Sequence, residues 1–385
     1  MMKYILLSII IICTKSYGQI IFGTNNYIEY RQGNLPIIIS VPHGGNISPS
    51  SIPNRTCNGA VSTTDANTIE LARQIDSAFV KATGCHPHII YCHLQRAKLD
   101  CNRNINDGAC GNAAAEIAWS EFNNFINTAQ TLAKNQYGGK ALYIDLHGHG
   151  NAIQRLELGY LLYDTELENP DTILNTPFYI GNSSIRNLVS TNVNSYTHAE
   201  LLRGNFAFGT LLGFAGYPSV PSQQIPFPGT TTNYYSGGYN TANHTSYLAS
   251  NTVNGLQIEC NYTNVRDSYL NRKTFSDSLV SVIKKYLSIH QTINFLNCSL
   301  TSTEPLKQLD QLLISPNPAK DYIQISNNNN NVIDFEIEII NTLGQTVFKT
   351  QNQTLLNIEK FERGLYVIKL TDQHKNTLTH KVLFQ

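Results

Sequence analysis

Residues 141–150 read Ala-Leu-Tyr-Ile-Asp-Leu-His-Gly-His-Gly, an apolar run over 141–146 that leads directly into a cluster of polar side chains. A short apolar run of this kind predicts a buried strand. Similar strands are predicted at Pro36–Val41, Ile89–Cys92 and Gly255–Glu259, and they alternate with helices predicted at Thr64–Lys81, Ala114–Lys134 and Arg272–His290. This alternation favours an α/β fold, with a mostly parallel or mixed sheet covered by helices on both faces.

Polar side chains stand where these strands end. His43 follows the first strand, His147 follows the strand at 141–146, and Glu259 ends the last strand. Asp65 lies near the start of the first predicted helix. The carboxyl ends of parallel strands meet at one edge of a sheet, and two histidines with a carboxylate are a common zinc set that leaves a position for water. A further carboxylate, here Glu259, would then move protons.

Two further residues of the 141–150 stretch are expected beside the ligands. Asp145 lies two residues before His147, so both side chains fall on one face of a strand, and Asp145 can accept an N–H from a metal-bound imidazole. His149 is expected next to the ligand as a second such neighbour. Other readings stay open: His43 as an ordinary loop histidine, and Asp65 as a cap of the helix that it precedes. Glu259 is harder to dismiss, because an unpaired buried carboxylate is costly.

A basic segment at 95–103 offers groups for binding an anion. Arg96 and Arg103 are seven residues apart, with Asp100 and Asn102 between them. Planar guanidinium groups suit a carboxylate or an oxyanion. The alternative is a solvated basic loop.

These motifs, in this order, resemble the N-formylglutamate amidohydrolase family, whose fold is similar to that of zinc carboxypeptidases. The resemblance runs over 36–261. It implies that His43, Asp65 and His147 are zinc ligands and that Glu259 is the general acid and base. Glu70 is the alternative to Asp65 as the third ligand.

The resemblance also implies roles for the basic segment, with Arg103 and Asn102 binding the substrate carboxylate and Arg96 stabilising an oxyanion. This sequence departs from the family pattern in places: Cys101 replaces the usual leucine, and Asn67 stands where a histidine is frequent. Residues 150–255 match no motif of the family, and we expect them to shape the substrate pocket.

The last 70 or so residues have a different character. Short strands predicted at Asp334–Ile340, Thr346–Lys349, Gly364–Leu370 and Thr377–Phe384 indicate a small antiparallel β-sandwich. The motifs at 314–319, 341–345, 364–369 and 381–382 resemble type IX secretion C-terminal sorting domains. The resemblance implies the secretion machinery as a partner and a secreted or cell-surface protein. A carbohydrate-binding β-sandwich is the alternative, although the only tryptophan of the chain, Trp119, lies outside this region.

Composition and termini complete the expected organisation. Residues 1–18 are predicted to be a signal peptide, 19–297 a catalytic domain, 298–311 a linker and 312–385 the sorting domain. No segment after the signal is apolar enough to be a transmembrane helix. Lys+Arg and Asp+Glu both number 27, so no net charge favours nucleic-acid binding.

Cysteines should pair in an oxidising compartment. The spacing does not fix the pairs, although the pairs Cys101–Cys110 and Cys85–Cys92 are close enough to form short loops.

The favoured function is a secreted, zinc-dependent hydrolase of amide bonds in an N-acyl amino acid or peptide that bears a carboxylate. The alternative is a non-catalytic cell-surface binding protein that keeps the fold. A serine hydrolase is remote, because the chain contains no Gly-x-Ser-x-Gly motif. Export favours an extracellular amide as the substrate over N-formylglutamate, the metabolite after which the family is named.

Overall fold

The computed structural model describes residues 19–57, 59–229, 233–295, 312–327, 335–372 and 377–385. The chain divides into two compact units, Met1–Ser299 and Leu300–Gln385. The predicted signal peptide and the whole of the predicted linker, which includes Cys298, lie outside the described residues. In the part of the chain that the structure describes, no helix has the length and apolarity to span a membrane.

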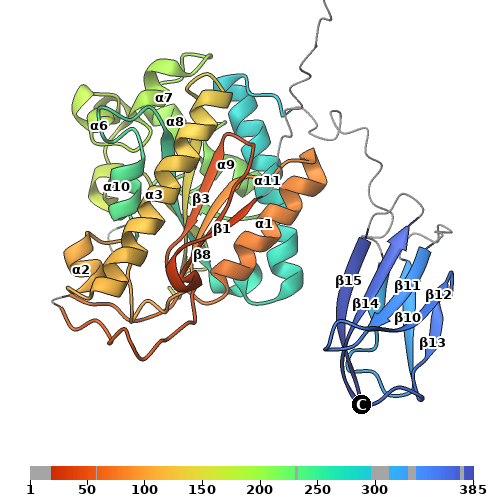
Figure 1. The fold of residues 1–385 in the computed structure, drawn as a ribbon. Helices are drawn as coiled ribbons and strands as arrows, with labels where there is room; N and C mark the ends of the chain where they lie inside the picture. Colours follow the sequence, from red (N-terminus) through yellow and green to blue (C-terminus); the bar gives the residue numbers. More distant parts are fainter. Residues whose placement is uncertain (1–18, 58, 230–232, 296–311, 328–334, 373–376) are drawn as a thin grey trace, which may run out of the picture. The chain divides into compact units, whose positions relative to one another are not determined.

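The first unit is built on an eight-stranded mixed sheet (Figure 1), in the order β1-β2-β4-β3-β5-β8-β6-β7. The four central strands, β4, β3, β5 and β8, are parallel, whereas β1, β2 and β6 pair antiparallel with their inner neighbours. The strands are β1 (Ile20–Phe22), β2 (Ile28–Arg31), β3 (Ile37–Val41), β4 (His88–Cys92), β5 (Leu142–His149), β6 (Leu156–Gly159), β7 (Ser219–Val220) and β8 (Asn254–Asn261). The predicted α/β class with a mostly parallel or mixed sheet is confirmed.

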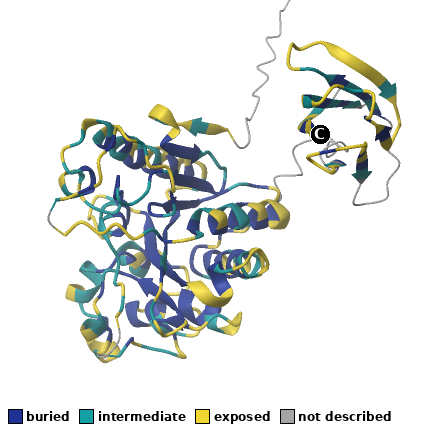
Figure 2. Cartoon of the chain, turned by 90° about the horizontal axis from the view of Figure 1, so that it is seen from below, coloured by how far each residue is buried: buried dark blue, intermediate teal, exposed yellow. Residues whose placement is uncertain are grey.

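Helices cover both faces of this sheet, so its central strands are buried between them (Figure 2). The helices are α1 (Thr68–Thr83), α2 (Ile105–Ala109), α3 (Ala113–Gln136), α4 (Asp164–Leu167), α5 (Asp171–Leu174), α6 (Pro177–Gly181), α7 (Arg186–Thr191), α8 (His198–Arg203), α9 (Phe208–Phe214), α10 (Tyr239–His244) and α11 (Tyr269–Gln291). The two faces of the sheet belong to two separate apolar clusters, as strand β3 shows. Ile37 and Ile39 pack in the cluster that includes α1 and α11, whereas Ile38 packs in the cluster that includes α3. Successive side chains of a strand point to opposite faces, so one short strand contributes to two cores.

Strand β5 runs further than the apolar pattern indicates. The prediction ends it at residue 146, but the strand continues to His149. The reason is pairing: β5 and β8 are in register from Leu142↔Asn254 to His149↔Asn261, so ladder hydrogen bonds support the polar end of both strands. His147 therefore has a fixed strand position directly beside Glu259.

The second unit consists of two antiparallel sheets, one of three strands in the order β13-β10-β9 and one of four in the order β12-β11-β14-β15. Its strands are β9 (Leu312–Ser315), β10 (Tyr322–Asn327), β11 (Phe335–Ile340), β12 (Thr346–Gln351), β13 (Leu355–Asn357), β14 (Gly364–Asp372) and β15 (Thr377–Phe384). Alternate residues of these strands, such as Ile337 and Ile339, bury in a separate apolar core. The antiparallel character of this unit agrees with its sequence pattern.

A disulfide joins Cys57 to Cys110. Cys92 and Cys101 are buried free thiols, so neither of the two short loops considered from the spacing forms in the structure. The Cys57–Cys110 bond links the irregular segment before α1 to the end of α2.

Candidate metal centre

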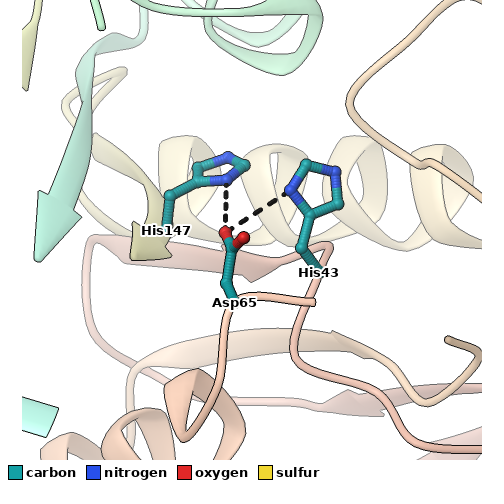
Figure 3. A group of neighbouring side chains, drawn as sticks. All are labelled: His43, Asp65 and His147. Atoms are coloured by element: carbon teal, nitrogen blue, oxygen red, sulfur yellow. Dashed lines mark hydrogen bonds and ion pairs between the residues drawn. The ribbon is translucent and has the colours of Figure 1, made fainter. Parts of the chain in front are cut away.

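Three buried side chains from distant parts of the chain meet at the carboxyl end of the parallel strands (Figure 3): His43, Asp65 and His147. One ligand atom from each lies within 4.8 Å of the others. The Asp65 Oδ2 atom is 3.1 Å from His147 Nδ1 and 3.5 Å from His43 Nδ1. Zinc binds histidine nitrogen and carboxylate oxygen at about 2.0–2.2 Å, so atoms at these separations can surround one ion.

The local backbone brings Asp65 to His43. The Asp65 N–H donates to the His43 carbonyl at 3.0 Å, which joins the segment before α1 to the residues after β3. The Asp65 carbonyl accepts from the Thr68 N–H and from Thr68 Oγ1, at 3.3 and 2.8 Å. The first turn of α1 is thus supported by the backbone of Asp65, and the carboxylate is left to face the histidines. Glu70, the alternative ligand, lies exposed on α1 and outside the cluster.

Each histidine is oriented by a second carboxylate. His43 Nε2 lies 2.6 Å from Asp100 Oδ1, and His147 Nε2 lies 2.8 Å from Asp145 Oδ2. A neutral imidazole that donates from Nε2 carries its lone pair on Nδ1, which here is the nitrogen facing Asp65. His43 Nδ1 is buried without a hydrogen-bond partner among the described residues, as expected for an atom that fits a metal ion.

The carboxylates of the site are held in their charged form. Burial opposes ionisation of Asp100, but its interaction with His43, which includes a hydrogen bond, and the charges of Arg96 and Arg55 outweigh burial and hold the pKa of Asp100 well below its usual range. For Asp145, burial is likewise outweighed by His147, and Ser40 Oγ adds a hydrogen bond at 2.5 Å, so its pKa is lowered. These anions favour a cation at the centre of the cluster.

Glu259 is the acid–base candidate beside this cluster. It lies on β8 opposite His147 and is 6% exposed, and its Oε1 accepts a hydrogen bond from Gln257 Nε2 at 3.1 Å. Burial raises the pKa of Glu259 to about 7, and the negative charges of Asp65 and Glu157 act in the same direction. A carboxyl group with this pKa can take up and return a proton near neutral pH.

The basic segment is organised around Asp100. Its Oδ2 atom lies 3.0 Å from Arg96 Nε, 3.4 Å from Arg103 Nε and 3.5 Å from Arg55 Nη2. Arg96 lines the cavity beside the cluster, whereas Arg103 is not among its lining residues. The sequence did not single out Asp100 as a partner of His43, although it stands between Arg96 and Asn102 in the motif.

Asn102 and His149 make mainly internal contacts. The Asn102 Oδ1 atom accepts the Asn240 N–H at 2.8 Å, and its Nδ2 lies 3.2 Å from His147 Nε2. His149 Nε2 donates to the Arg155 carbonyl at 2.8 Å, and its Nδ1 accepts the Asn151 N–H at 3.1 Å. The ring of His149 therefore serves the loop after β5 rather than a ligand side chain.

The cavity beside the cluster has a volume of about 280 Å³. Its wall includes Gln257 and residues 234–238, which belong to the stretch that matches no family motif. Glu157 holds this wall, since its Oε2 accepts the Tyr235 N–H at 3.1 Å. No sequence signal identified Glu157, because its partners depend on the pairing of β6 with β8.

Comparison of the sequence with curated proteins finds no match. Among solved structures, the chain is similar to N-formylglutamate amidohydrolase from Ralstonia eutropha JMP134, at 12% sequence identity and a TM-score of 0.40, covering 69% of this chain and 99% of that one. Residues 313–385 match the secretion system C-terminal sorting domain. The protein thus ends in a sorting domain of this class, which indicates a secreted or cell-surface protein.

Proposed function

We propose that the first unit is a zinc-dependent hydrolase of amide bonds whose substrate, an N-acyl amino acid or a peptide, bears a carboxylate. One observation carries the proposal: the Nδ1 atoms of His43 and His147 both face the Asp65 carboxylate, and the Nε2 atom of each histidine is paired with a buried aspartate. Glu259 lies beside this group, and burial raises the pKa of Glu259 to about 7. His43, Asp65 and His147 would hold the ion, with Asp100 and Asp145 orienting the imidazoles.

A zinc ion in this position would lower the pKa of a water molecule and polarise the substrate carbonyl. Glu259 accepts the proton as the water oxygen forms its bond to the carbonyl carbon. It then donates that proton to the amide nitrogen as the carbon–nitrogen bond breaks. The products are a carboxylic acid and an amine, and Glu259 returns to its starting state.

The arginines would bind the negatively charged groups of the substrate. Arg96 Nε is bound to Asp100 and Nη1 is 3.9 Å from Asp65 Oδ1, so the guanidinium lies at the wall of the cavity, where it can stabilise the oxyanion. Arg103 is 32% exposed and can bind the substrate carboxylate if the substrate extends past Arg96. Asn102 fixes the position of this segment through Asn240.

The organisation of the chain supports an extracellular substrate. We assign residues 1–18 to a signal peptide, 19–297 to the catalytic domain, 298–311 to a linker and 312–385 to the sorting domain, with the type IX secretion machinery as the partner of the last. A metabolite confined to the cytosol would not meet an exported enzyme, so an extracellular peptide or acylated amino acid is the better substrate.

The test is hydrolysis of N-acyl amino acids and short peptides by the zinc-loaded full chain, compared with Glu259→Gln. Removing the general base should lower kcat by about 10²–10⁴-fold while zinc stays bound. Glu70→Gln is the matched control, because Glu70 is exposed on α1, and it should change neither zinc content nor kcat. Full turnover by Glu259→Gln would contradict the mechanism, and loss of zinc from Glu70→Gln would contradict the ligand set.

A further inference from the structure

A second hollow, with a volume of about 420 Å³, lies between α3 and α10. This volume is in the range of small-molecule sites, about 300–1,000 Å³. The described residues that line it include two aromatic rings and four asparagines but no Asp, Glu, Lys or Arg. The hollow is therefore neutral, in contrast to the charged cavity of the metal centre.

The aromatic rings are Trp119 of α3 and Tyr239 of α10. Their centroids are 5.9 Å apart with an interplanar angle of 57°, and both residues are half-buried. The Trp119 Nε1 atom donates to the Arg103 carbonyl at 2.9 Å, which fixes the orientation of the indole. Each ring presents a π face with negative partial charge, which attracts polarised C–H groups.

Neutral hydrogen-bonding groups surround the rings. Asn124 and Asn127 are exposed on successive turns of α3 and present amides to solvent. Asn123 Oδ1 lies 2.9 Å from His244 Nε2, and His244 Nδ1 is buried without a hydrogen-bond partner among the described residues. The His244 ring is 4% exposed, and burial lowers its pKa to about 4, so it is neutral and adds no charge to the hollow.

We propose that this hollow is a binding site for a neutral pyranose sugar. The apolar C–H face of a pyranose packs on an aromatic ring, and its hydroxyl and acetamido groups pair with side-chain amides such as those of Asn124 and Asn127. An ionic ligand would find no partner for its charge among these lining residues and would lose hydration on entry.

The sugar site adjoins the cavity of the metal centre. Gly238 lines that cavity and Tyr239, the next residue, lines the hollow. The Asn240 N–H of α10 donates to Asn102 Oδ1, and the Trp119 Nε1 of α3 donates to the Arg103 carbonyl. Both helices therefore contact the basic segment. A substrate that occupies both hollows is a peptide amide attached to a sugar; this substrate class rests on the proposed function, whereas sugar binding does not.

Binding is measured with the full chain, using β-1,4-linked N-acetylglucosamine tetramer and cellotetraose as probes. Trp119 is the only tryptophan of the chain, so its fluorescence reports directly on this hollow, and calorimetry gives an independent affinity. The variants are Tyr239→Ala and the double variant Asn124→Ala with Asn127→Ala. Tyr269→Ala is the control, since Tyr269 is an exposed tyrosine at the start of α11 and does not line the hollow.

We expect saturable binding of at least one probe, weakened about ten-fold by Tyr239→Ala and unchanged by Tyr269→Ala or by a metal chelator. No saturable heat with either probe up to about 10 mM, or wild-type affinity in Tyr239→Ala, overturns the site. If circular dichroism shows that Tyr239→Ala is misfolded, the asparagine double variant decides: weaker binding supports the site, and unchanged binding overturns it.

The substrate class is tested by the hydrolysis of N-acetylmuramoyl-dipeptide and of the same N-acetyl-dipeptide without the sugar. A lower KM for the sugar-bearing compound, lost in Tyr239→Ala, supports it, and equal KM values overturn it. Sugar binding without hydrolysis of either compound contradicts the proposed function and the substrate class but leaves the sugar site standing.

Discussion

His43, two residues after the end of β3, and His147, on the adjacent strand β5, show the same arrangement. In each residue Nε2 is paired with a buried aspartate and Nδ1 faces Asp65. The aspartates favour the tautomer with its lone pair on Nδ1, so the two nitrogens that we propose as zinc ligands are oriented before an ion binds. The orientation of both histidines therefore depends on Asp100 and Asp145, and the proposed zinc affinity depends on these aspartates as well as on the candidate ligands.

Asp100→Asn should lower zinc affinity by about 10- to 100-fold, because the charged carboxylate that pairs with His43 Nε2 is replaced by a neutral amide. Competition with a chelator of known affinity measures the effect. Asp76→Asn is the matched control: Asp76 is also buried and also binds a histidine and an arginine, His86 and Arg31. It should reduce stability and leave zinc affinity unchanged. Equal zinc affinity in the two variants would show that Asp100 does not act through His43.

His88 should make the protein less stable in mild acid. Burial lowers the pKa of His88 from 6.5 to about 4, and its Nδ1 accepts the Gly33 N–H at 3.1 Å. Between these two pH values the unfolded chain binds a proton that the folded chain does not. The free energy of unfolding contributed by His88 is therefore full above pH 6.5 and is lost as the pH falls to about 4, a change of about 3 kcal/mol.

His88→Asn keeps an acceptor near the Nδ1 position and removes the titration. Denaturant unfolding at several pH values should show a shallower loss of stability between pH 6.5 and 4 in the variant than in the wild type. Parallel curves for the two proteins would mean that His88 titrates normally in the folded state.

The sequence predicted which side chains gather at the site but not all of their contacts. His43, His147 and Glu259 could be placed because each stands at a strand end, and strand ends share one edge of the sheet. The choice between Asp65 and Glu70 required the tertiary structure, which exposes Glu70. The pairing of Asp100 with His43 spans 57 residues of chain, and no local pattern encodes such a contact.

At the scale of elements, the segment between β3 and α1 is irregular in its described residues and carries Asp65 near its end, so its position depends on contacts with other parts of the chain. The disulfide from Cys57 to Cys110 attaches it to α2. Arg55 attaches it to the basic segment by donating to the Arg96 carbonyl at 3.0 Å, and to α2 by donating to the Asp107 carbonyl at 2.9 Å. These contacts hold Asp65, a candidate ligand, in place.

Replacing Cys57 and Cys110 together by serine should lower the free energy of unfolding. The bond closes a sequence separation of 53 residues, for which loop entropy gives about 4 kcal/mol. Zinc affinity should fall as well, because the segment that carries Asp65 gains freedom. Cys92→Ala, a buried free thiol, is the control in the same denaturation experiment and should keep wild-type zinc affinity. An unchanged unfolding midpoint in the double variant would rule out a stabilising role for the bond.

The elements themselves were predictable where their patterns are long. The helices α1, α3 and α11 and the strands β3, β4, β5 and β8 lie close to their predicted ranges. The short edge strands β1, β2, β6 and β7 were not predicted, because two to four residues carry too little periodicity. The same applies to the seven short helices α4–α10 between β6 and β8.

For the whole molecule, the division into two units separates the candidate metal centre from the sorting domain. Each unit has its own apolar core, and the residues of the candidate metal centre all lie in the first. The sorting-domain match covers residues 313–385 of the second. Four ordered motifs made this region recognisable from the sequence, whereas the folding of the first unit around its site depends on long-range contacts.

A chain that ends at residue 299 should keep the zinc content and turnover of the full chain, because the described residues that line the cavity belong to the first unit. A reporter carrying a secretory signal at its N-terminus and residues 313–385 at its C-terminus should be exported in a host with the matching secretion system. Turnover and export are measured separately. Loss of activity on truncation of a folded chain, or retention of the reporter inside the cell, would contradict the division.

The most direct test of the central claim is the zinc content of the purified full chain after reconstitution, measured by plasma mass spectrometry beside Asp65→Asn and Glu259→Gln. A catalytic site formed by His43, Asp65 and His147 predicts one zinc per wild-type chain, the same in Glu259→Gln, and a strongly reduced content in Asp65→Asn. Absence of stoichiometric zinc from the wild type, or full zinc in Asp65→Asn, would contradict the account.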